Sequence, residues 1–435
     1  MWTNWSGGQA CLPVAFERPS TRAEVRDAVE RAAQAGRTVR VAGSGHSFSD
    51  AALSNGTLLH LGALDRVLDA DPVTGLVRVE AGITLRRLSR ELLRLGLALP
   101  NLGDIDAQSL AGALATGTHG TGARLANLSA AVAGMELVLG DGTERSLDEG
   151  DGDLLRAARV GVGALGAVVA VTLRCVPAFR LRGLDEPREL DGVLEALDEL
   201  VDGNDHFEFW TFPHTRVALT RTNNRTEARR APLGRVRETL AEVWLDNLAF
   251  GALNRLARRV PRAIPQINRA AGAAASRRER VDWSFNVFAS PRLVHFEEME
   301  YAVPRAAARE ALAATTRVLE RHPVSFPVEL RFAAADDALL SPAHGRDTAY
   351  LAVHNYVGMP FEAPFREVEA LMAGFGGRPH WGKRSFLTAA ELVPRYPRWD
   401  AFARARAELD PDGRFANGFV RRMLGPVARE APALR

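Results

Sequence analysis

Helical and strand-like hydrophobic patterns alternate along the first part of the chain. Thr21 and Glu24 have the spacing of a capping box, and the apolar positions that follow repeat with a helical period until Gly36 ends them. A second amphipathic helix is predicted for 85–95. Strands are predicted from short apolar and β-branched runs at 39–42, 58–61, 76–80, 130–139 and 164–176. The Gly-Asp-Gly-Thr of 140–143 predicts a hairpin turn, so this part mixes helices and strands.

The pattern changes after Pro177, and Asp185-Glu186-Pro187 resembles a boundary between two units. Beyond it, helices are predicted for 190–200, 305–321 and 365–375, with an Arg/Ala-rich helical stretch between the first two. Strands are predicted for 207–212, 217–222, 294–302, 328–333 and 350–357. The layout predicts two α+β domains, residues 1–179 and residues 180–435.

Length and charge narrow the class of protein. A chain of 435 residues favours two domains, because a single core rarely grows so large. The content of 46% hydrophobic and 25% charged residues is typical of a globular protein. A formal net charge of +2 argues against nucleic acid as the main partner. Arginines crowd 255–280, which favours a solvated helical surface over a patch for an anionic membrane or a partner.

Cys11 and Cys175 are the two cysteines of the chain. Two lone thiols suit a reducing cytoplasm and exclude a disulfide scaffold or a cysteine-based zinc site, and we expect no metal. The N-terminus lacks the basic and apolar regions of a signal peptide. No window approaches about 18 consecutive apolar residues, so no transmembrane segment is expected. We therefore predict a cytoplasmic protein, with peripheral membrane association through the arginines as the alternative.

Three glycine-rich turns lie in the first part, and two of them contain a histidine. The first is Ala42-Gly43-Ser44-Gly45-His46-Ser47, the second is Thr116-Gly117-Thr118-His119-Gly120, and the third is 161–166, which precedes the long strand. Glycine exposes backbone N–H groups and serine or threonine adds a hydroxyl, so such turns favour a phosphate-bearing cofactor. An imidazole would crowd a plain phosphate cradle. His46 is therefore predicted to contact the ligand itself, even covalently, although a capped loop histidine is the structural alternative.

Two common nucleotide-binding motifs are incomplete here. The His46 turn lacks the third glycine of a Rossmann fingerprint. Residues 377–383 resemble a P-loop, but Arg384 stands where Ser or Thr should hold magnesium, and Pro379 removes a backbone donor. The motifs G-x-S-x-G and H-E-x-x-H are absent, so neither a serine hydrolase nor a zincin is indicated.

Taken together, the His46 turn, the 116–120 turn and His380-Trp381-Gly382-Lys383 resemble the aldonolactone oxidoreductases, which belong to the vanillyl-alcohol-oxidase-type flavoproteins. The segments 298–302, 328–331 and 378–383 are shared with the bacterial L-gulono-1,4-lactone dehydrogenases of this family. The resemblance covers nearly the whole chain. It implies an FAD-binding domain of the PCMH/VAO type over 1–179 and an α+β substrate (cap) domain over 180–435. A C-terminal segment, about 376–435, would return to the flavin.

The resemblance also implies how FAD is held. The flavin would be linked covalently through the ring of His46 to its 8α-methyl carbon. Ser109 and the 116–120 turn would hold the pyrophosphate and the isoalloxazine edge, and Gly166 and Val168 would contact the adenine half. The implied FAD-binding residues are Ala42, Gly43, Ser44, Gly45, His46, Ser47, Ser109, Gly112, Thr116, Gly117, Thr118, His119, Gly166 and Val168. Ser109 could equally be a plain loop hydroxyl, and no proton-transfer role is expected for His119.

Four residues of the second part resemble the family's substrate-site residues: Glu329, Arg331, His354 and Lys383. Glu329 and Arg331 lie two apart on a predicted strand, so both point to one face, where they can bond neighbouring sugar hydroxyls. Lys383 resembles the lysine that stabilises negative charge near N1 of the reduced flavin. The structural alternatives are an ion pair across the sheet, a buried core histidine and a surface lysine.

The implied reaction is the FAD-dependent oxidation of a sugar 1,4-lactone of the L-gulono-, L-galactono- or D-arabinono-type, by hydride transfer to the flavin. The electrons would pass to oxygen or to an external acceptor protein or dye. Tyr356 stands where alditol oxidases of this group have a threonine, which favours a lactone over a polyol such as xylitol. An alditol oxidase and a non-catalytic FAD-binding protein are the alternatives. The proton acceptor stays open between solvent and Glu329, and oxidase and dehydrogenase activity are not distinguished.

Overall fold

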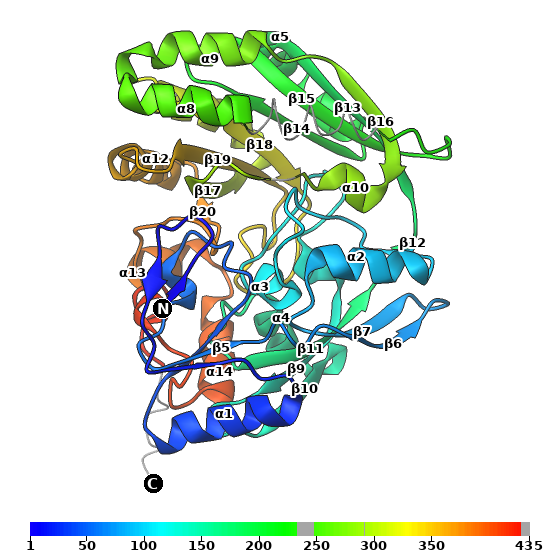
Figure 1. The fold of residues 1–435 in the computed structure, drawn as a ribbon, viewed down its shortest axis with the longest axis vertical. Helices are drawn as coiled ribbons and strands as arrows, with labels where there is room; N and C mark the ends of the chain where they lie inside the picture. The colour runs from blue at the N-terminus through cyan, green and yellow to red at the C-terminus, as the bar shows by residue number, and fades with distance from the viewer. Residues whose placement is uncertain (233–247, 291, 428–435) are drawn as a thin grey trace.

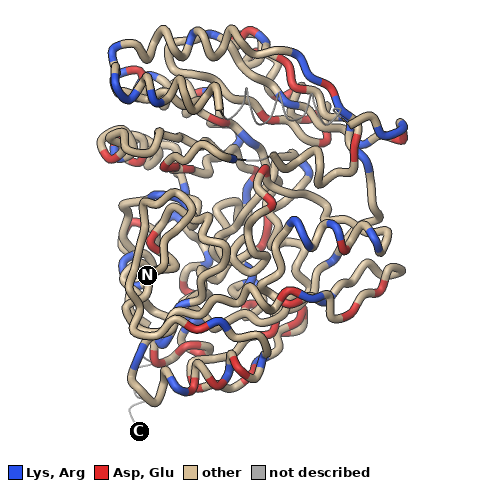
Figure 2. The backbone as a smooth tube through the Cα atoms, viewed as in Figure 1, with Lys and Arg blue, Asp and Glu red and all other residues tan. Residues whose placement is uncertain are grey.

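The computed structural model describes residues 1–232, 248–290 and 292–427 (Figure 1). The part of the predicted Arg/Ala-rich stretch at 233–247 and the end of the C-terminal segment at 428–435 lie outside the described residues. Positive and negative side chains are interspersed along the backbone (Figure 2), in keeping with the small net charge. Within the described ranges, no helix is both long enough and apolar enough to cross a membrane.

Two sheets form the lower part of the molecule in Figure 1. A three-stranded parallel sheet has the order β3 (Ala15–Glu17), β5 (Thr57–His60) and β4 (Val39–Ala42). A five-stranded antiparallel sheet has the order β10 (Glu144–Asp148), β9 (Val132–Val138), β11 (Ala167–Arg174), β7 (Leu76–Glu80) and β6 (Val67–Asp71). The helices of this part are α1 (Arg22–Gln34), α2 (Leu85–Arg94), α3 (Leu110–Ala115) and α4 (Asp153–Arg159).

The local sequence explains these elements. Thr21 caps α1 by accepting the N–H of Glu24, and Thr84 caps α2 in the same way. The predicted helices and strands of this part are confirmed, but the long strand begins at Ala167 rather than at 164. The backbone immediately before it turns, because Gly163 and Gly166 both have positive φ.

An eight-stranded antiparallel sheet forms the upper part. Its order is β16 (Arg278–Trp283), β13 (Arg180–Glu189), β15 (Val217–Thr226), β14 (His206–Thr211), β18 (Val328–Ala333), β19 (Thr348–Tyr356), β17 (Phe296–Pro304) and β20 (Arg378–Pro379). The helices of this part are α5 (Leu190–Glu195), α6 (Leu197–Asp202), α8 (Phe250–Arg259), α9 (Ile264–Ala273), α10 (Ser284–Phe288), α11 (Ala308–Leu319) and α12 (Glu362–Gly374). A hydrophobic core joins one face of the sheet to α5, α6, α11 and α12.

Two predictions for the upper part need correction. The triplet Asp185-Glu186-Pro187 is no boundary, since it lies inside β13. Pro187 is tolerated there because the pairing of β13 with β16 has already ended at Asp185, so no ladder hydrogen bond on that side is lost. The helix predicted for 190–200 is divided at Ala196 into α5 and α6.

The chain returns to the lower sheets after β20. The helices α13 (Ala389–Leu392), α14 (Trp399–Leu409) and α15 (Gly418–Leu424) pack into the core that contains β7 and α2. The N–H of Val39 in β4 donates to the carbonyl of Arg414, and the side-chain amide of Asn417 donates to the carbonyl of Leu53 at 2.8 Å. Figure 1 accordingly shows the C-terminal segment, orange to red, beside the N-terminal residues.

Candidate active site

A cavity of about 480 Å³ lies where the loops of the lower part meet the polar face of the eight-stranded sheet. Nine of the predicted site residues line it: His46, Ser47, Thr116, Thr118, His119, Glu329, Arg331, His354 and Lys383. These residues come from two loops, from β18 and β19, and from the segment after β20. The fold therefore gathers around one cavity side chains that are more than 300 positions apart in the sequence, as His46 and Lys383 are.

Other predicted cofactor residues lie near the cavity or away from it. A Cβ placed on Gly43 would collide with the hydroxyl of Ser109, and a Cβ on Gly112 would lie 2.9 Å from the same oxygen. These three residues therefore form one close-packed cluster beside the His46 turn. Gly166 and Val168 lie at the start of β11, where Val168 pairs with Leu137 of β9, and neither lines the cavity.

The turn after β4 presents His46 to the cavity. Gly45 has φ of +74°, which L side chains rarely adopt, and a Cβ there would lie 3.3 Å from the ring of Trp2. The Nδ1 atom of His46 is buried and has no hydrogen-bond partner among the described residues. Burial, helped by nearby Lys383, lowers the pKa of His46. The imidazole is therefore neutral at pH 7 and retains a lone pair.

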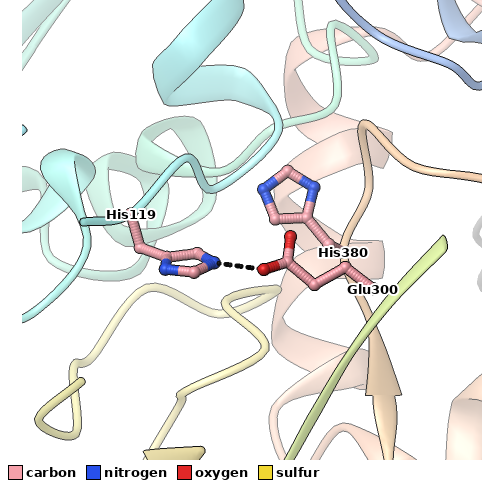
Figure 3. A group of neighbouring side chains, drawn as sticks. All are labelled: His119, Glu300 and His380. Atoms are coloured by element: carbon pink, nitrogen blue, oxygen red, sulfur yellow. Dashed lines mark hydrogen bonds and ion pairs between the residues drawn. The ribbon is translucent and has the colours of Figure 1, made fainter. Parts of the chain in front are cut away.

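His119, in the turn after α3, is held through both of its ring nitrogens, and one of them faces Glu300 (Figure 3). Its Nδ1 lies 2.8 Å from the carbonyl oxygen of Gly120, so Nδ1 must donate. Its Nε2 lies 3.1 Å from a carboxylate oxygen of Glu300, which also only accepts when ionised. Burial alone would raise the pKa of Glu300, but His119 and Lys383 lower it below its usual value. Both ring nitrogens of His119 are therefore engaged, and the ring is stacked on that of Tyr350.

His119, Glu300 and His380 lie close enough to resemble a metal site (Figure 3), with ligand atoms within 4.8 Å of one another. The hydrogen bonds do not suit a metal ion. The Nδ1 of His380 accepts the N–H of Gly382 at 3.0 Å, which leaves the proton of the neutral ring on Nε2. Burial lowers the pKa of His380 to about 3, so the ring is neutral. On His380, the lone pair that a metal would require is therefore occupied by the N–H of Gly382.

Glu298 is the second carboxylate on this face of β17, two residues before Glu300. One of its oxygens lies 2.5 Å from Nζ of Lys383, and the other lies 3.4 Å from Nε2 of His354. The Nδ1 of His354 lies 3.1 Å from the carbonyl oxygen of Pro327, so it must donate. Burial alone would lower the pKa of His354, but Glu298 raises it above its usual value. His354 is thus held as an imidazolium with both ring nitrogens engaged.

Arg331 occupies the centre of a cluster of carboxylates on the same face of the sheet. Its guanidinium lies 2.5 Å from Glu329, 2.8 Å from Glu208 on β14 and 3.2 Å from Asp104 in the loop before α3. Asp104 also pairs with Arg292. Burial, opposed by Arg331 and assisted by Asp104 and Glu208, raises the pKa of Glu329 to about 7. Glu329 is therefore poised to take or release a proton near neutral pH.

The structure adds four acidic residues to those that the sequence predicted, namely Asp104, Glu208, Glu298 and Glu300. Glu208, Glu298 and Glu300 could have been found in the sequence, because each is a charged residue within a largely apolar strand. Glu298 and Glu300 are two positions apart, so they lie on the same face of their strand. Asp104 carries none, because it lies in an irregular loop.

Comparison with known proteins gives consistent results along the whole chain. The family model "D-arabinono-1,4-lactone oxidase" matches residues 171–423, and the model "FAD binding domain" matches residues 13–148. The L-gulono-1,4-lactone dehydrogenase of Mycobacterium tuberculosis is 48% identical over 98% of this chain and 99% of its own length. The L-gulonolactone oxidase of Mus musculus is 33% identical over 97% of both chains, and an alditol oxidase of a Streptomyces species is 32% identical over 97% and 98%.

A solved structure shares the fold. A solvent-stable cholesterol oxidase superposes with a TM-score of 0.84 over 96% of both chains, at 20% sequence identity. At that identity, the likeness is one of fold alone.

Proposed function

The chain belongs to the D-arabinono-1,4-lactone oxidase family, and on this premise we propose how its cavity performs the reaction. The protein is an FAD-dependent oxidoreductase that acts on aldonolactones, and its FAD-binding fold is that of the vanillyl-alcohol-oxidase type. The predicted family, fold and activity are therefore confirmed. The alternative of an FAD-binding protein without turnover is not retained.

Two features of the chain suit FAD. The close-packed cluster of Gly43, Ser109 and Gly112 leaves no room for a side chain at Gly43, as expected of a backbone cradle. His46 has a buried, unpartnered ring nitrogen and a neutral imidazole. When bound, FAD would accept a hydride from the carbon that bears the reacting hydroxyl. We propose that the predicted turns hold FAD and that the ring of His46 carries it covalently.

The observation that carries the proposed mechanism is the pairing of Glu329 with Arg331 at 2.5 Å in the cavity that Lys383 also lines. Arg331 is held by three carboxylates and remains charged, so it would bind and orient the lactone hydroxyls rather than exchange a proton. Glu329, with its pKa raised to about 7, would accept the proton of the reacting hydroxyl.

Lys383 and His354 would supply fixed positive charge. Burial alone would lower the pKa of Lys383, but Glu298 and Glu300 raise it above its usual value, so this ammonium stays charged. A cation that is positioned before the reaction stabilises the negative charge that hydride transfer brings into the cavity. Both nitrogens of His354 are engaged, by Glu298 and by the carbonyl of Pro327. We therefore propose that His354 contributes a fixed positive charge and does not exchange a proton with the substrate.

Anaerobic spectroscopy tests the proposed substrate class. The purified protein with FAD is mixed without oxygen with L-gulono-1,4-lactone or with xylitol, and the visible absorption of the flavin is followed. We expect the lactone to bleach the flavin and xylitol to leave it unchanged. Bleaching by xylitol alone would favour the alditol alternative. Admitting air afterwards distinguishes an oxidase from a dehydrogenase. Oxygen would reoxidise the flavin of an oxidase and restore its colour, whereas the flavin of a dehydrogenase would stay reduced until an acceptor dye is added.

A further inference from the structure

An N-terminal hairpin, residues 2–11, covers the His46 turn. Its strands β1 (Trp2–Thr3) and β2 (Ala10–Cys11) pair antiparallel. The N–H of Trp5 donates to the carbonyl of Gly45 at 2.8 Å, and the side-chain amide of Asn4 donates to the carbonyl of Ser47 at 3.0 Å. The hairpin thus binds the backbone on both sides of His46. That turn therefore cannot change its conformation without breaking these bonds.

The indole of Trp5 also lies against the His46 ring. The two rings are stacked, with centroids 5.7 Å apart and planes inclined by 28°. Trp5 also contacts the ring of His295, with centroids 4.6 Å apart, and makes an edge-to-face contact with Phe296 at 5.4 Å. Trp5 is therefore held by its own neighbours and presents a flat face to the imidazole.

The hairpin is anchored beside the charged residues of the cavity as well. The hydroxyl of Ser6 donates to Glu297 at 3.1 Å, and Arg384 donates to the other oxygen of the same carboxylate at 2.7 Å. Glu297 directly precedes Glu298, and Arg384 directly follows Lys383. The position of the indole is thus tied to both sides of the cavity: to the His46 turn and to the sheet.

We propose that Trp5 is a positioning residue for the covalent attachment of FAD to His46, because its stacked indole holds the imidazole in the orientation that the new bond needs. This inference rests on the proposed covalent link. In the reaction, an N–H bond of the imidazole and one C–H bond of the flavin 8α-methyl group break, and an N–C bond forms. The two protons and two electrons that are released pass finally to dioxygen, which becomes hydrogen peroxide.

The test measures attachment and not catalysis. The full-length wild type, Trp5→Leu and Trp5→Met are purified with FAD, incubated in air with added FAD and sampled over time. Acid precipitation then separates covalent flavin in the pellet from released flavin in the supernatant. We expect attachment to be about tenfold slower in both variants, since small misplacement of reacting groups costs at least this much. Total bound FAD should stay at the wild-type level. The methionine variant, whose unbranched side chain adapts to irregular gaps, serves as the test if the leucine variant folds poorly.

Trp283→Leu is the matched control, since Trp283 is another half-buried tryptophan but lies on β16, at the far edge of the sheet. It should attach FAD at the wild-type rate. Wild-type rates in both Trp5 variants would overturn the role of Trp5 and leave the covalent link intact. Loss of total FAD with an unchanged covalent fraction would overturn it too. If wild-type flavin stays in the supernatant, the covalent link itself is wrong, and this inference falls with it.

Discussion

Glu298 and His354 face each other across the neighbouring strands β17 and β19, and the same carboxylate holds Lys383. A single acidic side chain therefore fixes two cations in the cavity. The Nδ1 of His354 donates to the carbonyl of Pro327. A second proton, on Nε2, is therefore stabilised by the carboxylate of Glu298.

Glu298→Gln should remove that proton. An amide can donate to Nε2 of His354 but cannot stabilise its positive charge. Burial, assisted by Lys383 and opposed by Glu329, would then lower the pKa of His354 below its usual value. In NMR spectra with ¹⁵N-labelled histidine at pH 7, His354 should change from the imidazolium to the neutral form. Anaerobic flavin reduction by the lactone should slow by about tenfold or more. An imidazolium signal that persists in the variant would contradict the assignment.

Arg331→Met should destabilise the fold, because it leaves Glu329, Glu208 and Asp104 buried without their shared cation. We expect the free energy of unfolding at pH 7 to fall by about 3–5 kcal/mol in denaturant titrations. Without the cation, burial raises the folded-state pKa of Glu329 further above its unfolded value. The destabilisation should therefore shrink as the pH falls toward 5.

Arg174→Met is the control for this loss, since Arg174 pairs with Glu149 and both side chains are exposed. It should change the stability little. A similar small change in Arg331→Met would show that the carboxylate cluster does not need its arginine.

Gly120→Ala should loosen the 116–120 turn, which we propose holds FAD. A Cβ at Gly120 would collide with the carbonyl oxygen of Leu102 and with the side-chain oxygen of Asn101. Because one of these atoms belongs to the backbone, a rotamer change cannot relieve the collision, and the strain should cost about 1–3 kcal/mol. We expect a lower melting temperature and a lower FAD content per chain. Gly374→Ala, where the added methyl meets open space, should resemble the wild type.

His46→Ala should bind FAD without holding it covalently. The flavin of the wild type should remain in an acid-precipitated pellet, whereas the flavin of the variant should appear in the supernatant. His60→Ala, which removes another half-buried histidine, on β5, should behave like the wild type. Covalent flavin in His46→Ala would place the link on a different residue.

The strands and their polar positions could be predicted from the sequence because a period of two is a local signal. Glu329 and Arg331 share a face of β18 for this reason, and the glycine-rich composition of the His46 turn indicated a cofactor. The role of Glu298 could not be predicted, because it depends on the register between β17 and β19, which folding sets over long range. Asp104 was missed since an irregular loop has no period. The boundary at 185–187 was wrong because a proline is tolerated in β13 beyond the residues that pair with β16.

The most direct test of the mechanism is the pH dependence of anaerobic flavin reduction by L-gulono-1,4-lactone in the wild type and in Glu329→Gln. If Glu329 accepts the hydroxyl proton, it must be ionised, so the wild-type rate should rise with pH through about 7. Glu329→Gln should react about 100-fold more slowly and lose this rise. Glu208→Gln, which changes another carboxylate beside Arg331, should keep it. A wild-type rise that survives unchanged in Glu329→Gln, with equal FAD content, would contradict the account.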